Sequence, residues 1–160
     1  MKCKTRAAAV ARYGGIDFAS RHWPKQREWI EIFQVPEGWF PGWRVSGTVH
    51  PVEHIAINKD MHAPLMAALT AVHNKGLGKL LVTFGGCFNI RMVRGTSASP
   101  STHSYGLALD ICPEQNPLGA THGGFYDHPE FVKCFTDQGF DWGGHWVHRK
   151  DPMHFSYAWE

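Results

Sequence analysis

Two short segments of the chain carry residue types that bind metal ions and move protons. In the first, His103 stands just before an expected strand and Asp110 lies inside that strand. Because side chains alternate along a strand, Asp110 lies on the face opposite its apolar neighbours. A carboxylate in that position requires a cationic partner. Taken alone, either residue would be interpreted as an ordinary hydrogen-bonded side chain.

The second segment places Asp151 three positions before His154, between an aromatic-rich loop and the last expected strand. A catalytic zinc ion needs three protein ligands, an open fourth position, and a carboxylate outside the metal shell that accepts a proton from water. His103, Asp110 and His154 supply the three ligands, and Asp151 supplies the base. The expected cofactor is therefore Zn²⁺, and most of the eleven histidines have no part in the site.

These residues belong to a longer series of motifs. The order is Ser-x-His-x-Tyr-Gly-x-Ala-x-Asp, then Asn-Pro, then Gly-Phe-x-Trp-Gly-Gly-x-Trp, then Asp-x-Met-His-Phe. The series runs from about Phe84 to Tyr157 and resembles the M15 metallopeptidases. The branch it resembles most is the L-alanyl-D-glutamate peptidases of phage endolysins, which are related to the D-alanyl-D-alanine carboxypeptidases and share the hedgehog-type fold. Several motifs in the right order are more specific than one short pattern.

The resemblance implies the same three ligands and the same base, and it adds an arginine upstream of the first ligand. That arginine polarises the substrate carbonyl or holds a substrate carboxylate, and it falls on Arg91, with Arg94 as a second choice. A guanidinium suits this role because it binds carboxylates through two hydrogen bonds. The alternative for either residue is a solvated surface charge.

Three further residues of the motifs are candidates for the substrate site. Ser101 is expected to donate a hydrogen bond to a ligand or to the substrate, and Tyr105 and Trp142 are expected to line the cleft. The alternative for all three is plain packing.

Three other residues stand near the expected site. Cys112 replaces the asparagine usual in such sequences, and strand alternation places its thiol on the same face as Asp110, within reach of the metal. His145 and His148 are interpreted as loop residues near the mouth of the site.

The spacing of apolar residues along the chain predicts the helices and strands that position these side chains. Apolar residues at helical spacing predict a helix over 60–75, ended by Gly76, and a second helix over 129–138, begun by Asp127 or His128 and stopped by Gly139. Strands are predicted over 80–84, 107–111 and 153–159. Residues 1–45 are rich in aromatics, and their prolines predict short elements. We assign these aromatics to the core, and the alternative is a wall-binding or sugar-stacking surface; they include Trp23, Trp29, Phe33, Trp39, Phe40 and Trp43. The expected class is α+β, a small mainly antiparallel sheet with flanking helices in the hedgehog or DD-peptidase-like zinc peptidase fold.

Length and composition limit the remaining choices. We expect 160 residues to form a single domain, 1–160, and 43% hydrophobic content is typical of a globular chain. A net charge of +2 without a basic cluster argues against nucleic acid as a partner. No apolar run reaches the length of a signal peptide or membrane span, and the four cysteines form no CxxC pair. Synthesis in the cytoplasm without membrane association is therefore expected.

The expected function is hydrolysis of the peptide part of bacterial peptidoglycan, at the bond between L-Ala and D-Glu. The partner is then the peptidoglycan stem peptide, the protein is a monomer, and a phage lysin of this type reaches the wall through a holin-type pore, as the resemblance implies. Two alternatives remain, a D-alanyl-D-alanine carboxypeptidase or dipeptidase with the same metal chemistry, and a non-catalytic zinc-containing binding domain. A base such as Asp151 argues against the second.

Overall fold

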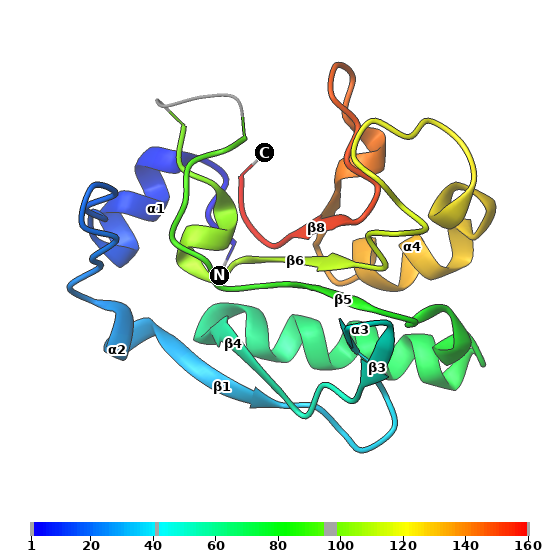
Figure 1. Cartoon of the computed structure of the whole chain (residues 1–160). Helices are drawn as coiled ribbons and strands as arrows, with labels where there is room; N and C mark the ends of the chain where they lie inside the picture. The colour runs from blue at the N-terminus through cyan, green and yellow to red at the C-terminus, as the bar shows by residue number, and fades with distance from the viewer. Residues whose placement is uncertain (1, 41, 95–98, 160) are drawn as a thin grey trace.

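The central feature of the computed structural model, which describes residues 2–40, 42–94 and 99–159, is a four-stranded antiparallel sheet. Its order is β5-β6-β8-β7, with β5 (Phe84–Gly86) and β7 (Asp141–Trp142) at the edges. The two central strands are β6 (Ala108–Ile111) and β8 (His154–Ser156). Figure 1 shows α3 beneath this sheet and the loops that precede β6 and β8 above it.

The N-terminal part forms short elements, as predicted. Helices α1 (Arg6–Tyr13) and α2 (Gln26–Trp29) lead into β1 (Ile30–Gln34), which pairs with β4 (His54–Asn58). Between these two strands, β2 (Trp43–Val45) and β3 (Thr48–His50) make a separate hairpin. The aromatic residues Trp23, Phe33 and Phe40 are buried, which confirms their assignment to the core, whereas Trp43 is 43% exposed.

Two α-helices cover the sheet. The 3₁₀ turn η1 (Lys59–Met61) leads into α3 (His62–Asn74), which packs against α4 (Pro129–Thr136). The predicted stop signals are correct, because Gly76 and Gly139 both adopt the left-handed conformation that ends a helix. The start of α4 differs from the prediction in one detail: His128 precedes the helix, but neither its side chain nor that of Asp127 caps it. Short 3₁₀ turns complete the chain: η2 (Gly78–Leu80), η3 (Thr102–Tyr105), η4 (Gly124–Asp127) and η5 (Gly143–His145).

The strand predicted over 80–84 is wrong in extent. Leu80 ends the turn η2, and strand pairing begins only at Phe84. Leu81 is fully buried in an irregular segment, and the amide of Val82 donates to the sulfur of Cys112 instead of to a strand. A short apolar run is buried in the same way by a turn as by a strand, so its pattern does not distinguish the two.

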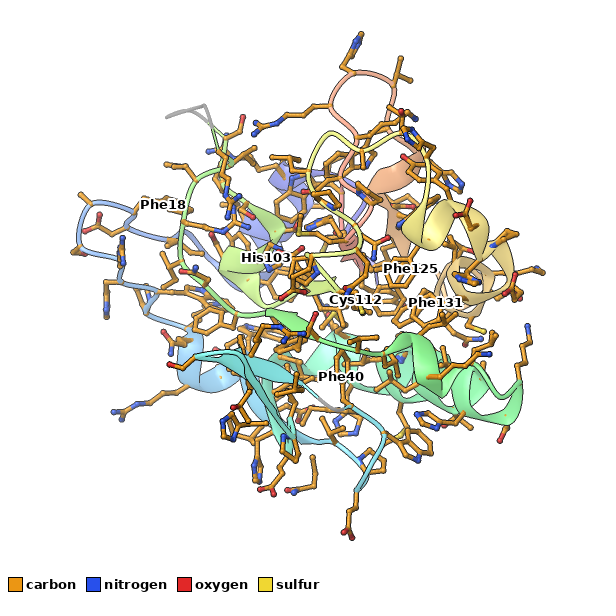
Figure 2. All side chains as sticks on the ribbon, turned by 45° about the vertical axis from the view of Figure 1, so that its right-hand side comes forward. Phe18, Phe40, His103, Cys112, Phe125 and Phe131 are labelled. Carbon is orange, nitrogen blue, oxygen red and sulfur yellow. The ribbon has the colours of Figure 1, made fainter. Side chains whose placement is uncertain are left out.

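The class is α+β with small antiparallel sheets, as predicted, and it is compatible with the M15 fold. Leu109 and Ile111 of β6 are fully buried and face the core, which also holds the helix residues Leu65 and Leu69. Figure 2 shows the side chains on the ribbon, with the buried residues Phe40, Phe125 and Phe131 labelled. None of the described helices is long and apolar enough to cross a bilayer. The sheet therefore has one face against the core and another that is available for polar residues.

Candidate metal centre and its cleft

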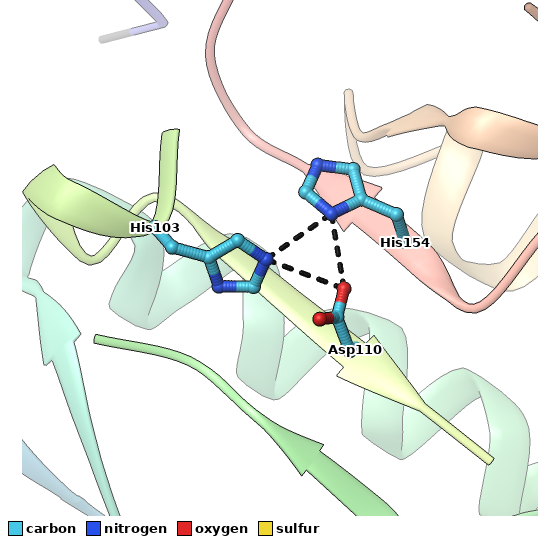
Figure 3. Close-up of side chains that lie close together, drawn as sticks. All are labelled: His103, Asp110 and His154. Atoms are coloured by element: carbon cyan, nitrogen blue, oxygen red, sulfur yellow. Dashed lines mark hydrogen bonds and ion pairs between the residues drawn. The ribbon is translucent and has the colours of Figure 1, made fainter. Parts of the chain in front are cut away.

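Three side chains with metal-binding atoms meet on the polar side of the central sheet. His103 comes from η3, Asp110 from β6 and His154 from β8, where Asp110 and His154 stand directly opposite each other in the strand register. Nε2 of His103 lies 3.2 Å from Nδ1 of His154 and 3.2 Å from Oδ1 of Asp110, and the last two atoms are 3.0 Å apart (Figure 3). Among the described residues, His103, Asp110 and His154 form the one group of three or more metal-binding side chains that lie close enough together to hold an ion.

The chemistry of the donor atoms fits a cation. Nδ1 of His103 lies 2.6 Å from the carbonyl oxygen of Cys87, which only accepts, so Nδ1 carries the hydrogen and Nε2 presents a lone pair to the cluster. A single N–H on His154 can donate only one of the hydrogen bonds in this triangle. A cation at its centre can accept lone pairs from all three atoms. Ligands about 2.0–2.2 Å from a tetrahedral zinc lie about 3.3 Å apart, close to the observed separations.

Asp110 is an ionised carboxylate in this setting. Burial by itself would raise its pKa, but hydrogen bonds that His103 and His154 donate in their protonated forms hold the pKa of Asp110 well below its usual range, and a cation at the centre takes the place of those protons. Its side chain is only 17% exposed. The cluster therefore contains a fixed negative charge that favours a bound cation.

The turn that carries His103 is built by its own sequence. Ser101 accepts a hydrogen bond from the amide of His103, and Gly106 ends the turn at a φ of 65°. A Cβ at Gly106 would also lie 2.9 Å from the amide nitrogen of Asn58, so only glycine fits there. The hydroxyl of Ser104 donates to the carbonyl of Arg91 and accepts from its amide. These contacts fix the turn against the segment before it.

Asp151 is close to the cluster but is surrounded differently. Its Oδ1 is buried and has no hydrogen-bond partner among the described residues. Burial raises the pKa of Asp151, opposed by the nearby charge of His154. Its backbone is tied to Gly143, where a Cβ would overlap the carbonyl of Asp151, and the indole of Trp142 donates to the carbonyl of Pro152 at 2.7 Å. A buried carboxylate with an unused oxygen is suited to accept a proton.

Two hollows meet at the cluster, and Arg91, Arg94 and Asp110 line both. The first hollow has a volume of about 310 Å³ and is also lined by Ser101, Trp146, Arg149, Asp151 and His154. The second hollow, of about 370 Å³, is also lined by Trp43, His54, Asn89 and His103. The cluster thus lies between two spaces of similar size, one beside each histidine.

Most of the residues that the sequence singled out surround this cleft. Both candidate arginines, Arg91 and Arg94, are on it, and Ser101 lines the first hollow while capping the turn of His103. Arg149 was not predicted, although it stands two positions before Asp151. Its guanidinium donates to the carbonyl of Arg94 at 2.7 Å, so the loops before β6 and before β8 touch beside the first hollow.

Tyr105 and Trp142 line neither of these two hollows, although Trp142 lines two others, shared with Thr136 of α4 and with His145. The ring of Tyr105 is 1% exposed, packs against Trp23, and donates its hydroxyl hydrogen to the carbonyl of Gly14. Trp142 is 5% exposed and packs on Phe155. Both residues are packed in the core, which was the alternative interpretation. Burial removes a large apolar ring surface from water and so stabilises the fold.

Cys112 also differs from its expectation. It adopts a φ of 50°, which turns the chain out of strand geometry directly after β6 and breaks the alternation. Its thiol donates to the carbonyl of Leu80, and burial raises its pKa, so it does not join the ligand cluster. His145 packs against Trp142, and neither His145 nor His148 lines the two hollows.

Three residues at the cleft were missed by sequence reasoning besides Arg149. Trp146, whose ring centroid lies 5.4 Å from that of His154, stands in the Gly-Gly-x-Trp motif and could have been found there. Trp43, which the sequence assigned to the core together with the neighbouring aromatics, and His54 come from the N-terminal part, about 50 residues or more before His103.

Comparison with known families agrees with this geometry. Residues 94–157 match the model of an M15 peptidase family described as D-alanyl-D-alanine carboxypeptidase. The matched region contains His103, Asp110, Asp151 and His154, whereas Arg91 lies outside it. No match was found among curated proteins. The family match supports an M15 metallopeptidase related to peptidoglycan processing, and the cluster could hold the metal such an enzyme requires.

Proposed function

We propose that this protein is a zinc-dependent peptidase that hydrolyses the stem peptide of bacterial peptidoglycan between L-Ala and D-Glu. The observation that carries the proposal is the contact of two imidazole nitrogens and one carboxylate oxygen at 3.0–3.2 Å, with the unpartnered oxygen of Asp151 on the same cleft. Three ligands with a separate carboxylate match a catalytic zinc site, whereas a structural zinc site is closed by a fourth ligand.

In this proposal His103, Asp110 and His154 hold the zinc ion. Zinc, when bound, supplies a Lewis acid that activates water and polarises the scissile carbonyl. Asp151 takes the proton from the attacking water and returns it to the leaving amine. Asp110 is ionised and completes the ligand set, and the carbonyl of Cys87, which accepts a hydrogen bond from Nδ1 of His103, keeps Nε2 of that ring turned to the centre.

The arginines act on the substrate. Arg91 lines both hollows beside Asp110, which suits a residue that stabilises the oxyanion or holds a carboxylate next to the scissile bond. Arg94 and Arg149 extend the positive charge along the first hollow. Ser101 acts indirectly, by holding the turn that carries His103.

The two hollows favour an internal bond over a terminal one. An endopeptidase must hold substrate on both sides of the scissile bond, and space is available on both sides of the cluster. The alternative is a D-alanyl-D-alanine carboxypeptidase, and the description of the matching family favours it. In that case Arg91 or Arg94 would bind the terminal carboxylate.

We also propose an endolysin role for the protein, which its resemblance to that branch supports. It implies that the protein acts as a monomer on the cell wall, without nucleic-acid or membrane partners, after synthesis in the cytoplasm and holin-type release. The motif Gly-Phe-x-Trp-Gly-Gly-x-Trp supports this branch.

Digestion of purified peptidoglycan, followed by mass spectrometry of the released peptides, tests the bond. The expected products carry a new N-terminal glutamate, with no rise in free D-alanine. Release of D-alanine from a pentapeptide, with the L-Ala to D-Glu bond intact, would favour the carboxypeptidase and leave the metal site standing.

Metal analysis tests the centre separately. The purified protein should hold one zinc per chain, and His103→Ala and His154→Ala should each lose most of it together with activity. His145→Ala is the matched control, because this histidine lies on the neighbouring loop and outside both hollows. Full zinc in both ligand variants would show that the centre lies elsewhere.

A further inference from the structure

One aromatic ring of the N-terminal part differs from the others in its surroundings. Trp23, Phe33 and Phe40 are buried, and Trp39 is stacked on His73. Trp43 is 43% exposed and lines the second hollow. Its ring makes an edge contact with Phe84, with centroids 4.9 Å apart, so the indole is supported from the sheet side. An exposed, supported tryptophan beside a candidate active site is suited to bind a ligand.

The two hollows also differ in chemical character. Arg91 and Arg94 are common to both, and the first hollow adds the guanidinium of Arg149 together with two half-buried indoles, those of Trp146 and Trp159. The second hollow adds the exposed indole of Trp43, with the imidazole of His54 and the carboxamide of Asn89. Guanidinium groups select carboxylates, whereas an aromatic face with nearby hydrogen-bonding groups suits a ring that is apolar on its faces and polar at its edge.

The proposed substrate has the same asymmetry. On the amino side of the L-Ala to D-Glu bond, L-Ala is attached to the muramyl sugar, and on the carboxyl side the stem peptide carries free carboxylates. We propose that the second hollow is a sugar subsite, in which the muramyl ring stacks on Trp43, while the carboxylates of the peptide lie in the first hollow near Arg149. This inference rests on the proposed function and adds the direction in which the substrate binds. The sugar end of a glycan-linked stem peptide lies in the second hollow, and the peptide end lies in the first.

Kinetics with two substrates test the sugar subsite: a muramyl-linked stem peptide and the same peptide without the sugar. The wild-type protein should cleave the muramyl form with a kcat/KM about 10-fold higher, the scale expected for one well-placed aromatic contact. Trp43→Ala should lose this preference, so that the ratio of the two kcat/KM values falls to about one. Trp43→Phe should keep most of the preference, because it retains an aromatic face.

Ile32→Ala is the matched control, since Ile32 is 62% exposed and lines neither hollow. It should keep both the activity and the preference. If Trp43→Ala loses activity equally on both substrates, or if the wild-type protein has no preference for the muramyl form, the sugar subsite is wrong and the peptidase proposal stands. If the wild-type protein cleaves neither substrate at the L-Ala to D-Glu bond, the peptidase proposal itself fails.

Discussion

The two carboxylates near the candidate metal centre have opposite surroundings, and these surroundings separate their proposed roles. Asp110 is bonded to two histidines, which hold its pKa well below the usual range against the effect of burial. Asp151 is half-buried, its buried Oδ1 has no partner among the described residues, and the burial raises its pKa. Pairs of titratable groups whose pKa values diverge in this way mark a division of labour, here between ligand and base.

The division predicts the behaviour of Asp151→Asn. This change removes the proton acceptor but none of the three ligands, so zinc content should stay at one per chain while kcat falls about 100-fold or more. The metal-free variant should melt no lower than the metal-free wild type at pH 7, because the charged form of a carboxylate with a raised pKa destabilises the folded state. Metal analysis gives the zinc content, kinetics give kcat, and thermal melting gives the stability of the metal-free proteins. Loss of zinc would identify Asp151 as a ligand.

At the scale of elements, the segment between β7 and β8 holds Asp151 through a few backbone contacts. The amide of Asp151 donates to the carbonyl of Gly143, and the indole of Trp142 donates to the carbonyl of Pro152. Pro152 lies between the proposed base and the ligand His154 in the chain. Trp142, expected in the cleft, therefore acts on the site from behind, through the backbone.

Trp142→Phe should reveal that support. Phenylalanine keeps a ring in the core but leaves the buried carbonyl of Pro152 without its hydrogen bond, which costs about 1–3 kcal/mol of the free energy of unfolding. Activity should fall as well, because Asp151 and His154 flank the affected backbone. Denaturant unfolding and kinetics measure the two effects.

Trp29→Phe is the control for that change. The indole nitrogen of Trp29 is buried and has no hydrogen-bond partner among the described residues, so the same substitution there removes no hydrogen bond. Its free energy of unfolding should change less than that of Trp142→Phe. Equal losses in both variants would mean that ring volume, and not the hydrogen bond to Pro152, explains the effect.

The elements also show which features a sequence pattern can predict. The helix over 60–75 was predicted nearly to its ends, because apolar spacing and the left-handed Gly76 both mark it. The strand over 80–84 failed because burial of an apolar run does not require strand pairing. The predicted position of the Cys112 thiol, on the same face as Asp110, was wrong because this residue has a positive φ. The alternating sequence pattern of a strand does not reveal a positive φ at a non-glycine residue. The candidate ligands were found because their motifs are local to η3, β6 and β8.

At the scale of the whole molecule, the N-terminal part is tied to the rest by polar contacts between distant residues. The guanidinium of Arg12 binds both carboxylate oxygens of Asp60, at 2.7 and 2.9 Å, and Tyr13 donates to the same group. Lys2 forms an ion pair with Asp141 of β7. Trp43 and His54 reach the cleft only because this part packs against the sheet, so no local motif could have predicted them.

Asp60→Asn should weaken this connection. Burial would raise the pKa of Asp60, but hydrogen bonds from Arg12 and Tyr13 lower it overall. A lowered pKa means that the ionised carboxylate stabilises the fold above the unfolded pKa of about 3.9 and that this contribution is lost as the pH falls through the folded pKa. The variant should lose about 1–2 kcal/mol at pH 7, and the loss should shrink in acid.

Asp137→Asn provides the comparison. Asp137 pairs with Lys133 one helical turn away, and both side chains are largely exposed, so its loss should change stability by less than about 0.5 kcal/mol. Chemical denaturation of both variants at neutral and acidic pH measures the difference. A pH-independent loss in Asp60→Asn would contradict the electrostatic explanation.

The division of the cleft between two stretches of chain has an evolutionary consequence. The four proposed ligand and base residues fall within 94–157, whereas the hairpin that carries Trp43 lies far upstream. If Trp43 binds the muramyl sugar as proposed, substitutions in the hairpin change recognition without touching the proposed ligands and base. Directed evolution toward a different glycan could use this separation by randomising residues 43–50.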